Sequence, residues 1–548
     1  MERTRNVDVH DTNADHSTAD HTRDNDTPNN DTPDNDTPDN DTPDNDTPDN
    51  DTPDNDTNAE GFAASRLLFA GLCTFLDGER AGALDHGALE EALAEQGREL
   101  LRQLYQDHLD LRAEREGRLA VVVDTDGVSR TSVEPGHHRG LATVFGTVQV
   151  QRMAYRRRGQ PNLHPADAML NLPTERHSHG LRRLAAEAAA HGSFDHATEA
   201  IRRDTGTRSA KRQVEALATR AAADVDDFYA TRPHQPADPG DILVLSSDGK
   251  GIVMRPDALR PATKAAAKAS SSKLATRLSK GEKRNRKRMA TVGAVYDLAP
   301  VPRTATDVLA TSDTPTPAPK AANKWLTASV AADTTAVLAA VFDQAQRRDP
   351  THSRTWVALV DGDNHQIDRI HAEAKDRGVT VTVLLDFVHV LEYLWRAAWS
   401  FYPEGDPNAE TWVHDKALGI LNGNASTVAA AIRRKATRRD LPAARRVGAD
   451  KCADYLLRKR GYLDYPKALA NGWPIATGII EGACRHIVKD RMDITGARWG
   501  LNGAEAILKL RAVHANGDFD DYWAHHTAQE RRRVHQSRYA NAVIPRAA

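Results

Sequence analysis

Two short apolar runs, each ending in an acidic residue, constrain the fold of this chain more than any other feature. The run WVALV leads into Asp361, and after an amphipathic segment the run VTVTVLL leads into Asp386. Apolar runs separated by an amphipathic helix are typical of neighbouring buried strands in an α/β sheet. Open sheets of this kind bind ligands at the carboxyl ends of their strands, so both acids are candidate site residues. The alternative is that each aspartate only caps the helix that follows it.

A third acid is expected on an earlier strand. The segment DILVLSSDGKGIVMRP predicts a strand that delivers Asp248, a turn on Gly249 and Gly251, and then a partner strand. Another strand (MATVGAVYDL), a strand or extended piece, and a helix at 334–347 lead on to WVALV. This order of strands and helices is that of an RNase H-like catalytic domain, whose first part is expected at 240–390.

The chain after the last strand is predicted to be helical for a long stretch. Residues 391–472 carry apolar side chains at helical spacing and show no strand pattern, which predicts an all-helical insertion. The catalytic core is expected to resume at 473–548, a span that also holds the C-terminal tail. A helix in this last part carries Glu481 near its start. The predicted fold class is therefore α/β, with a helical insertion inside the catalytic domain.

The first 58 residues differ in composition from the rest of the chain. A DNDTP repeat runs from Asp24 to Thr57 and offers almost no apolar surface, so residues 1–58 are predicted to be a disordered acidic tail. The repeat could compete with nucleic acid for the protein's own basic surface, or it could have no role. The formal net charge of the whole chain is −4, but the chain without this tail is basic, which is compatible with a polyanionic partner.

Composition and motifs exclude several classes of protein. No apolar run is long enough to span a membrane, and the polar, acidic N-terminus is unlike a signal peptide. The three cysteines, Cys73, Cys452 and Cys484, lack the spacing of a zinc ribbon or a disulfide framework. The patterns GxSxG and GxxxxGKS/T are absent, so neither a serine hydrolase nor an ATP-driven enzyme is indicated. A cytoplasmic location is expected.

Residues 59–232 predict a mainly helical N-terminal region. Residues 59–118 have the spacing of an amphipathic helix pair, and the next segment alternates like a small antiparallel β unit that ends in an arginine cluster. Three helices are expected at 178–229, with a break at 207–210 that is similar to a helix-turn-helix. The helix after the break begins with Lys211 and Arg212, which are candidate DNA-binding residues. Any small three-helix unit would give the same pattern, and the arginine cluster could be a solvated face.

A basic segment lies between the first two strands of the expected catalytic domain. The stretch KLATRLSKGEKRNRKR, within 264–288, lacks a helical apolar stripe and suits contacts with a phosphate backbone. A nuclear-localisation patch or a solvated loop would have the same composition. The candidate DNA-binding residues of this loop are Lys280, Lys283, Arg284, Arg286, Lys287 and Arg288.

Carboxylates that converge beside a basic surface have a chemical use. Cleavage of a DNA phosphodiester needs an activated water or 3′-hydroxyl and a stabilised leaving oxygen, and a pair of Mg²⁺ ions supplies both. Hard cations of this kind bind oxygen ligands, and Mn²⁺ accepts similar ligands. The pattern therefore favours a two-metal site held by Asp and Glu side chains.

Four segments give the chain a specific resemblance. SSDGKG, VDGDNHQI, DFVHVLEYLW and GIIEGACRHIVKDRM resemble the motif blocks of the ISKra-type bacterial insertion-sequence transposases, relatives of the Mutator-like DDE transposases. The similarity covers the chain except for the DNDTP tail. The resemblance implies that Asp248, Asp361 and Glu481 are the catalytic, metal-binding acids. Asp386 and His389 then match a C/D-x-x-H element that positions the site or an unpaired DNA end, although the roles of Asp361 and Asp386 could be exchanged.

The resemblance also implies an activity and partners. The expected protein is a DDE transposase that binds the terminal inverted repeats of its element, cleaves DNA strands with bound metal and transfers them to target DNA. A homodimer or larger synaptic complex is expected because two element ends must be joined, and the expected location is the bacterial cytoplasm, at the nucleoid. The alternatives are a non-transposing RNase H-like nuclease and a catalytically inactive DNA-binding regulator.

Overall fold

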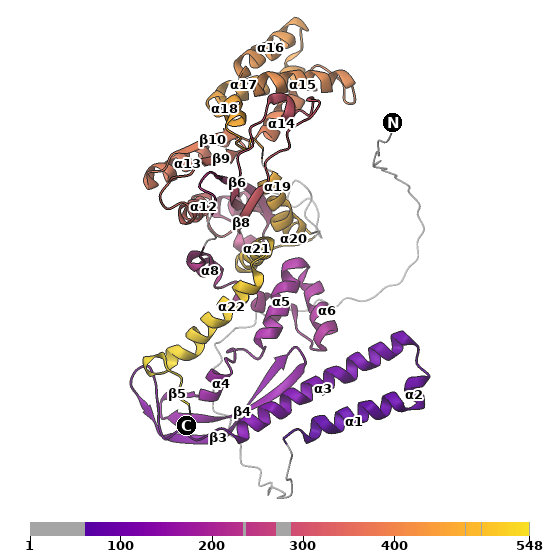
Figure 1. The fold of residues 1–548 in the computed structure, drawn as a ribbon, viewed down its shortest axis with the longest axis vertical. Helices are drawn as coiled ribbons and strands as arrows, with labels where there is room; N and C mark the ends of the chain where they lie inside the picture. The colour runs from indigo at the N-terminus through magenta and orange to yellow at the C-terminus, as the bar shows by residue number, and fades with distance from the viewer. Residues whose placement is uncertain (1–60, 234–236, 270–285, 477, 495, 547–548) are drawn as a thin grey trace, which may run out of the picture. The chain divides into compact units, whose positions relative to one another are not determined.

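The structure of the protein is a computed structural model. It describes residues 61–233, 237–269, 286–476, 478–494 and 496–546 (Figure 1). The described residues all belong to one compact unit. The acidic tail predicted at 1–58 lies outside them, as do three residues of the predicted basic loop, Lys280, Lys283 and Arg284.

A five-stranded mixed sheet lies within the largest hydrophobic core. Its strands are β6 (Ile242–Val253), β7 (Lys287–Leu298), β8 (Ala321–Ser329), β9 (Trp356–Val360) and β10 (Val381–Leu385). Their spatial order is β10, β9, β6, β7, β8 (Figure 1). β10, β9 and β6 run parallel to one another, while β7 is antiparallel to both β6 and β8. All residues of β9 are buried, as expected for an apolar run in the middle of a sheet. The predicted α/β class is confirmed by this sheet and the helices around it.

β6 continues without interruption past Asp248, so the turn predicted at Gly249 and Gly251 is wrong. Both glycines lie inside the strand and pair in register with β7. A Cβ atom at Gly251 would lie 2.9 Å from Cδ of Lys287. One at Gly249 would lie 3.1 Å from Cε of Met289. The glycines therefore let side chains of β7 lie close across β6, and they do not reverse the chain.

Helices from before and after the helical span 391–472 pack on the sheet. α12 (Thr334–Arg348) packs on β6 and β7, and α13 (Asn364–Arg377) packs on β9 and β10. Later in the chain, α19 (Gly478–Ala483) and the π-helical segment η3 (Cys484–Lys489) pack on β6. α21 (Leu501–Ala515) packs on β8. The chain thus returns to the central strand of the sheet after a long excursion.

The chain between β10 and α19 is helical. Its helices are α14 (Phe387–Ala398), α15 (Pro407–Leu421), α16 (Ala425–Arg438), α17 (Ala443–Arg458), η2 (Arg460–Tyr462) and α18 (Tyr465–Ala470). α14 packs on α15 and α17, and α16 packs on α17 (Figure 1). The structure assigns no strand to residues 391–472, all of which it describes.

The N-terminal part of the described chain combines long helices with two small antiparallel sheets. Its helices are α1 (Ala63–Asp77), α2 (Glu79–Gly82), α3 (His86–Glu114) and α4 (Pro165–Met169). Its strands are β1 (Val122–Val123), β2 (Ser129–Arg130), β3 (Ser132–Thr143), β4 (Gly146–Arg157) and β5 (Gln160–Leu163). α1 packs on α3, and α3 packs on β4 of the β3–β4–β5 sheet.

Four helices follow where three were predicted. They are α5 (His179–His191), α6 (Phe194–Thr205), α7 (Lys211–Ala221) and α8 (Val225–Thr231). The single helix predicted from α7 through α8 is wrong because the chain breaks at 222–224. At the break, the buried Asp224 lies 2.7 Å from Nδ1 of His526 and accepts a 2.9 Å hydrogen bond from Arg533. These contacts with the C-terminal helices favour the break over a continuous helix.

Short elements complete the described chain. They are η1 (Pro256–Ala258), α9 (Pro261–Ala269), α11 (Ala305–Val308), α20 (Asp490–Met492), α22 (Phe519–Glu530), η4 (Arg531–His535), η5 (Gln536–Arg538) and η6 (Ala540–Ala542). α9 shows that part of the basic segment after β6 is helical, where the sequence predicted a loop without a helical stripe.

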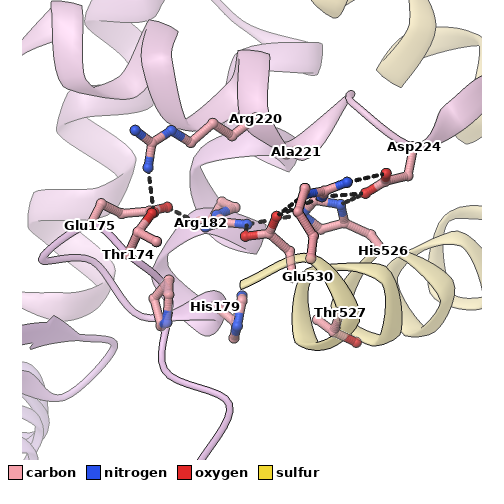
Figure 2. A network of polar contacts seen from close by, with 12 residues as sticks. Thr174, Glu175, His179, Arg182, Arg220, Ala221, Asp224, His526, Thr527 and Glu530 are labelled. Atoms are coloured by element: carbon pink, nitrogen blue, oxygen red, sulfur yellow. Dashed lines mark hydrogen bonds and ion pairs between the residues drawn. The ribbon is translucent and has the colours of Figure 1, made fainter. Parts of the chain in front are cut away.

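A buried polar network joins α5 to the C-terminal helix α22. Figure 2 shows the fully buried guanidinium of Arg182 between the carboxylates of Glu175 and Glu530, with a 2.8 Å contact to Oε2 of Glu530. The same guanidinium lies 3.0 Å from Nε2 of His526, whose other ring nitrogen contacts Asp224. Because its charges are hydrogen-bonded to one another, the network fixes how the N-terminal helices contact α22.

The acidic members of this network predict a loss of stability in acid. Burial would raise the pKa of Glu530, but hydrogen bonds from Arg533 and Arg182 outweigh burial and lower it to about 2. A lowered carboxylate pKa stabilises the fold above the ordinary pKa of 4.5, and this contribution disappears as the pH falls toward about 2. We expect urea unfolding to give a larger free energy of unfolding for wild type than for Glu530→Gln at neutral pH. This difference should shrink as the pH falls from 4.5 toward about 2. A difference in free energy of unfolding that does not change with pH would contradict the lowered pKa of Glu530.

Candidate active site

Three aspartates occupy neighbouring positions at one edge of the central sheet. The last residues of β10 and β9 pair with each other, so the next residues, Asp386 and Asp361, lie side by side. The register between β6 and β9 likewise brings Asp248 beside Asp361. Residues in register on neighbouring strands project to the same face of a sheet. The carboxyl ends of β9 and β10, together with the adjacent position within β6, therefore gather three acids in one place.

Glu481 approaches the same strand from the helix that follows the helical span. It lies exposed in α19, one turn before Cys484, whose thiol is 3.3 Å from Oδ2 of Asp248. Burial raises the pKa of the Cys484 thiol, and the charges of Asp248 and Glu481 raise it further. Both carboxylates therefore lie near this thiol. The helix changes to π-helical geometry at Cys484, and such changes are frequent at functional sites.

The two aspartates after β9 and β10 have different local roles. Asp386 is 3% exposed, and its Oδ1 accepts a 2.7 Å hydrogen bond from the backbone N–H of Val388 at the start of α14. Helix α13, in contrast, is capped by Asp363, whose carboxylate accepts from the N–H of Gln366. The carboxylate of Asp361 also accepts a 2.9 Å hydrogen bond, from the backbone N–H of Asp363, but it caps no helix and is half-buried where Asp386 is buried. The carboxylate of Asp361 is therefore the more accessible of the two to a ligand.

A tyrosine from α17 supports the loop that carries Asp361. The hydroxyl of Tyr455 donates a 3.1 Å hydrogen bond to the backbone carbonyl of Asp361. Gly362 has φ +99°, and a Cβ atom there would lie 3.1 Å from the Tyr455 hydroxyl oxygen, so glycine is required for this approach. Burial raises the pKa of Tyr455, as do Tyr393, Asp361 and Asp386. The phenol therefore stays neutral and acts as a donor.

His389 lies in the first turn of α14, three residues after the helix cap. Its side chain is half-buried, and Nδ1 is 3.9 Å from a carboxylate oxygen of Glu392. The spacing places His389 on the same side of the helix start as Asp386.

The residue types at this edge fit Mg²⁺, although their side chains are not preassembled around a metal position. Among the described residues, no cationic side chain forms an ion pair with Asp248, Asp361 or Glu481. Within the same part of the chain, no three His, Cys, Asp or Glu side chains are arranged to hold a metal ion. Hard carboxylate oxygens without a cationic partner are the donors that Mg²⁺ prefers.

The end of the predicted basic loop lies in a strand. β7 begins at Lys287, so Lys287 and Arg288 are strand residues and the predicted loop boundary is wrong at this end. The Arg288 guanidinium donates hydrogen bonds of 2.7 Å and 3.0 Å to the carbonyls of Val330 and Ala331. Arg288 therefore stabilises the fold locally. Lys287 is exposed and Arg286, just before the strand, is half-buried.

The helix-turn-helix-like pattern corresponds to α6 and α7. α6 ends at Gly206, which has the left-handed φ of 71° that favours glycine at a helix end. After a short turn α7 begins with Lys211 and Arg212, and both side chains are exposed. The ammonium of Lys211 lies 2.5 Å from Asp195 on α6.

Two residues of the acidic edge were not predicted from the sequence. Cys484 follows Glu481 by three positions, and this helical spacing was a usable signal that the two residues lie on the same side of the helix. Tyr455 lies 94 residues after Asp361, and no local pattern connects the two.

The sheet and its edge define a mixed α/β protein with carboxylates gathered at the ends of parallel strands. The chain matches no model of a known protein family, and no curated protein matches its sequence. None of the described helices combines the length and the apolar character that crossing a membrane requires.

Proposed function

We propose that this protein is a DDE transposase whose catalytic domain is RNase H-like. The observation that carries the proposal is the position of three acids without cationic partners among the described residues: Asp248 on β6, Asp361 after the adjacent strand β9, and Glu481 on the helix that packs on β6. The strand order and the long helical span before Glu481 support the same assignment. The motif blocks that resemble ISKra-type transposases contain all of these residues.

The three acids have a direct role in this chemistry. Asp248, Asp361 and Glu481 would hold Mg²⁺, which, when bound, activates the attacking oxygen and stabilises the leaving one. The capping carboxylate of Asp386 orients the start of α14, and with it His389. Tyr455 holds the backbone of the loop that carries Asp361. Mn²⁺ is expected to substitute, because carboxylate oxygens suit both ions.

The proposed substrate is double-stranded DNA at the ends of a mobile element. The exposed start of α7 is the candidate reader of the DNA, and the basic segment between β6 and β7 is the candidate contact with its backbone. Such an enzyme would act at the bacterial nucleoid. The alternatives are a nuclease that cuts without regard to element ends and a regulator that binds DNA without cutting it.

The test is a cleavage assay on DNA that contains the flanks of the protein's own gene. We expect Mg²⁺-dependent breaks at defined positions in the flanks, with 3′-hydroxyl ends that join to a second DNA. Replacing Mg²⁺ by Ca²⁺ is expected to keep binding and stop cleavage. Breaks scattered over any DNA would favour the nuclease, and binding without any breaks would favour the regulator.

The surface of α1 supports the proposed assembly of two or more copies. α1 is rich in apolar residues, yet Ser65 is its one buried residue, and Leu67 and Phe69 are 74% and 58% exposed. Residues 1–60 contain no Leu, Ile, Phe, Tyr or Trp, so this part of the chain offers no matching apolar surface. An apolar helix in water needs a partner, and joining two element ends requires a second copy of the same chain.

Placing charge on this face is expected to reduce the oligomeric state. The double change Leu67→Asp/Phe69→Asp should lower the mass measured by light scattering while leaving the helical content unchanged, because neither side chain is part of the core. Val447→Asp, at a residue of α17 that is 46% exposed, is the matched control and should not alter the mass. An unchanged mass for the α1 variant would show that this face is not the interface.

A further inference from the structure

A basic pocket lies between the α6–α7 unit and the carboxyl end of β6, beyond Asp248. Its volume is about 400 Å³. The cationic residues that line it are Lys211, Arg212, Arg255, Arg491 and Arg498, and the acidic ones are Asp195 and Glu215. The cations outnumber the acids, so the pocket is suited to an anion.

Arg491 is the buried member of this lining. It is 2% exposed, its Nε donates a 2.9 Å hydrogen bond to the carbonyl of Ala189, and its guanidinium stacks on Trp499 and Phe194 at 4.7 Å and 5.3 Å from the ring centres. Its Nη2 has no hydrogen-bond partner among the described residues, where no carboxylate pairs with it either. Burial and the nearby Arg511 lower its pKa to about 10, so it remains charged at neutral pH. A buried cation without an anionic partner is costly, and a bound anion would remove that cost.

The backbone around the pocket adds to its preference for anions. α7 begins at the pocket, and its N-cap residue, Ala210, has no side chain that can accept from the first N–H groups of the helix. Uncapped N–H groups and the helix dipole favour an anion at this position. Trp499 exchanges backbone hydrogen bonds with the end of β6, donating to Val253 at 3.1 Å and accepting from Arg255 at 2.8 Å. Arg255 and its neighbour Arg498 are thereby held at the same end of the strand.

We propose that this pocket binds a phosphate group of the backbone of double-stranded DNA, an inference that rests on the proposed function. The chemistry is that of a phosphate, because several arginines and a helix N-terminus converge on one position. The source is DNA, because Lys211 and Arg212 belong to the helix that is the candidate DNA reader. Arg255 follows Asp248 by seven residues along an extended strand, or roughly 23 Å at about 3.3 Å per residue. Because β6 ends at Val253, this length is an upper limit, and at about 3.4 Å per base pair a phosphate in the pocket would lie within roughly seven base pairs of the acids.

The experiment compares the wild-type protein with Arg255→Ala/Arg498→Ala, in which two exposed arginines of the pocket are removed. Binding to a short duplex of arbitrary sequence is measured against salt concentration, and binding of inorganic phosphate is followed by ³¹P line broadening at constant ionic strength. We expect the slope of log K against log salt to become shallower by about 0.9, the value for one phosphate contact, and the phosphate broadening to disappear. The Arg255→Lys/Arg498→Lys variant should keep much of the wild-type slope and of the phosphate broadening. Arg80→Ala, which removes an exposed arginine on α2, should change neither measurement.

Three results would overturn the inference. An unchanged slope with loss of phosphate broadening would show a site for free phosphate that DNA does not use. No change in either measurement would show that the pocket is only a solvated basic surface. A wild-type protein that binds inorganic phosphate but no DNA would remove both the inference and the proposed function, whereas DNA binding with an unchanged slope removes the inference alone.

Discussion

Asp361→Asn is expected to abolish metal-dependent strand cleavage, whereas Asp386→Asn should leave a measurable part of it. Asp361 is half-buried, is not the cap of the helix that follows, and lies in register with Asp248, so its carboxylate is the one proposed to bind metal. Asp386 is buried and caps α14. Loss of a residue that supports metal ligands typically costs about 10- to 100-fold in activity, so loss of a direct ligand should exceed about 100-fold. Asp248→Asn and Glu481→Gln should resemble Asp361→Asn.

Asparagine makes this a matched comparison. It is isosteric with aspartate and is itself a good helix cap, so Asp386→Asn keeps the start of α14 intact. Single-turnover cleavage of the flank DNA in Mg²⁺ measures activity, and DNA binding in Ca²⁺ serves as the control, which should be nearly equal for all variants. If Asp386→Asn loses all cleavage and Asp361→Asn retains it, the roles of the two aspartates are exchanged.

The strands of the central sheet could be predicted where burial alone determines them. WVALV contains β9, which is buried along its whole length and therefore apolar throughout. VTVTVLL contains the edge strand β10, whose last three residues are buried. The same reasoning failed at Gly249 and Gly251, because glycine is a turn signal only when no neighbouring strand competes for the backbone. In the fold, β7 pairs along the whole length of β6, and this pairing outweighs the local preference.

The acids of the candidate site could be predicted from the sequence, but the helix caps and the tyrosine contact that hold them in place could not. Asp361 and Asp386 directly follow parallel strands, and Asp248 lies within β6 in register with Asp361, so the shared register of the sheet brings the three acids together. The sequence did not show which aspartate caps which helix, since Asp363 takes that role for α13 at a distance of only two residues from Asp361. The contact from Tyr455 depends on how a distant helix packs, which no local pattern encodes.

The buried network in Figure 2 also joins residues that lie far apart in the sequence. Breaking it is expected to cause a large loss of stability. Arg182→Met should lower the free energy of unfolding by about 3 to 5 kcal/mol, the usual cost of removing one partner from a buried ion pair. Methionine fills similar space, so the loss comes mainly from the carboxylates of Glu175 and Glu530, which lose their shared buried cation and keep only the more exposed Arg220 and Arg533 as partners (Figure 2). Urea unfolding followed by circular dichroism measures the change.

The neighbouring residue provides the control for this prediction. Arg183 lies on the same helix, pairs with Glu187 and Asp520 at the surface, and has a side chain that is 38% exposed. Because surface ion pairs contribute about 0 to 1 kcal/mol, Arg183→Met should shift the unfolding midpoint only slightly. Adding Glu530→Gln to Arg182→Met should recover part of the loss, since it removes one of the two carboxylates that have lost their shared buried cation. Equal effects of Arg182→Met and Arg183→Met would mean that the network does not hold α5 against α22, and that apolar packing between these helices is sufficient.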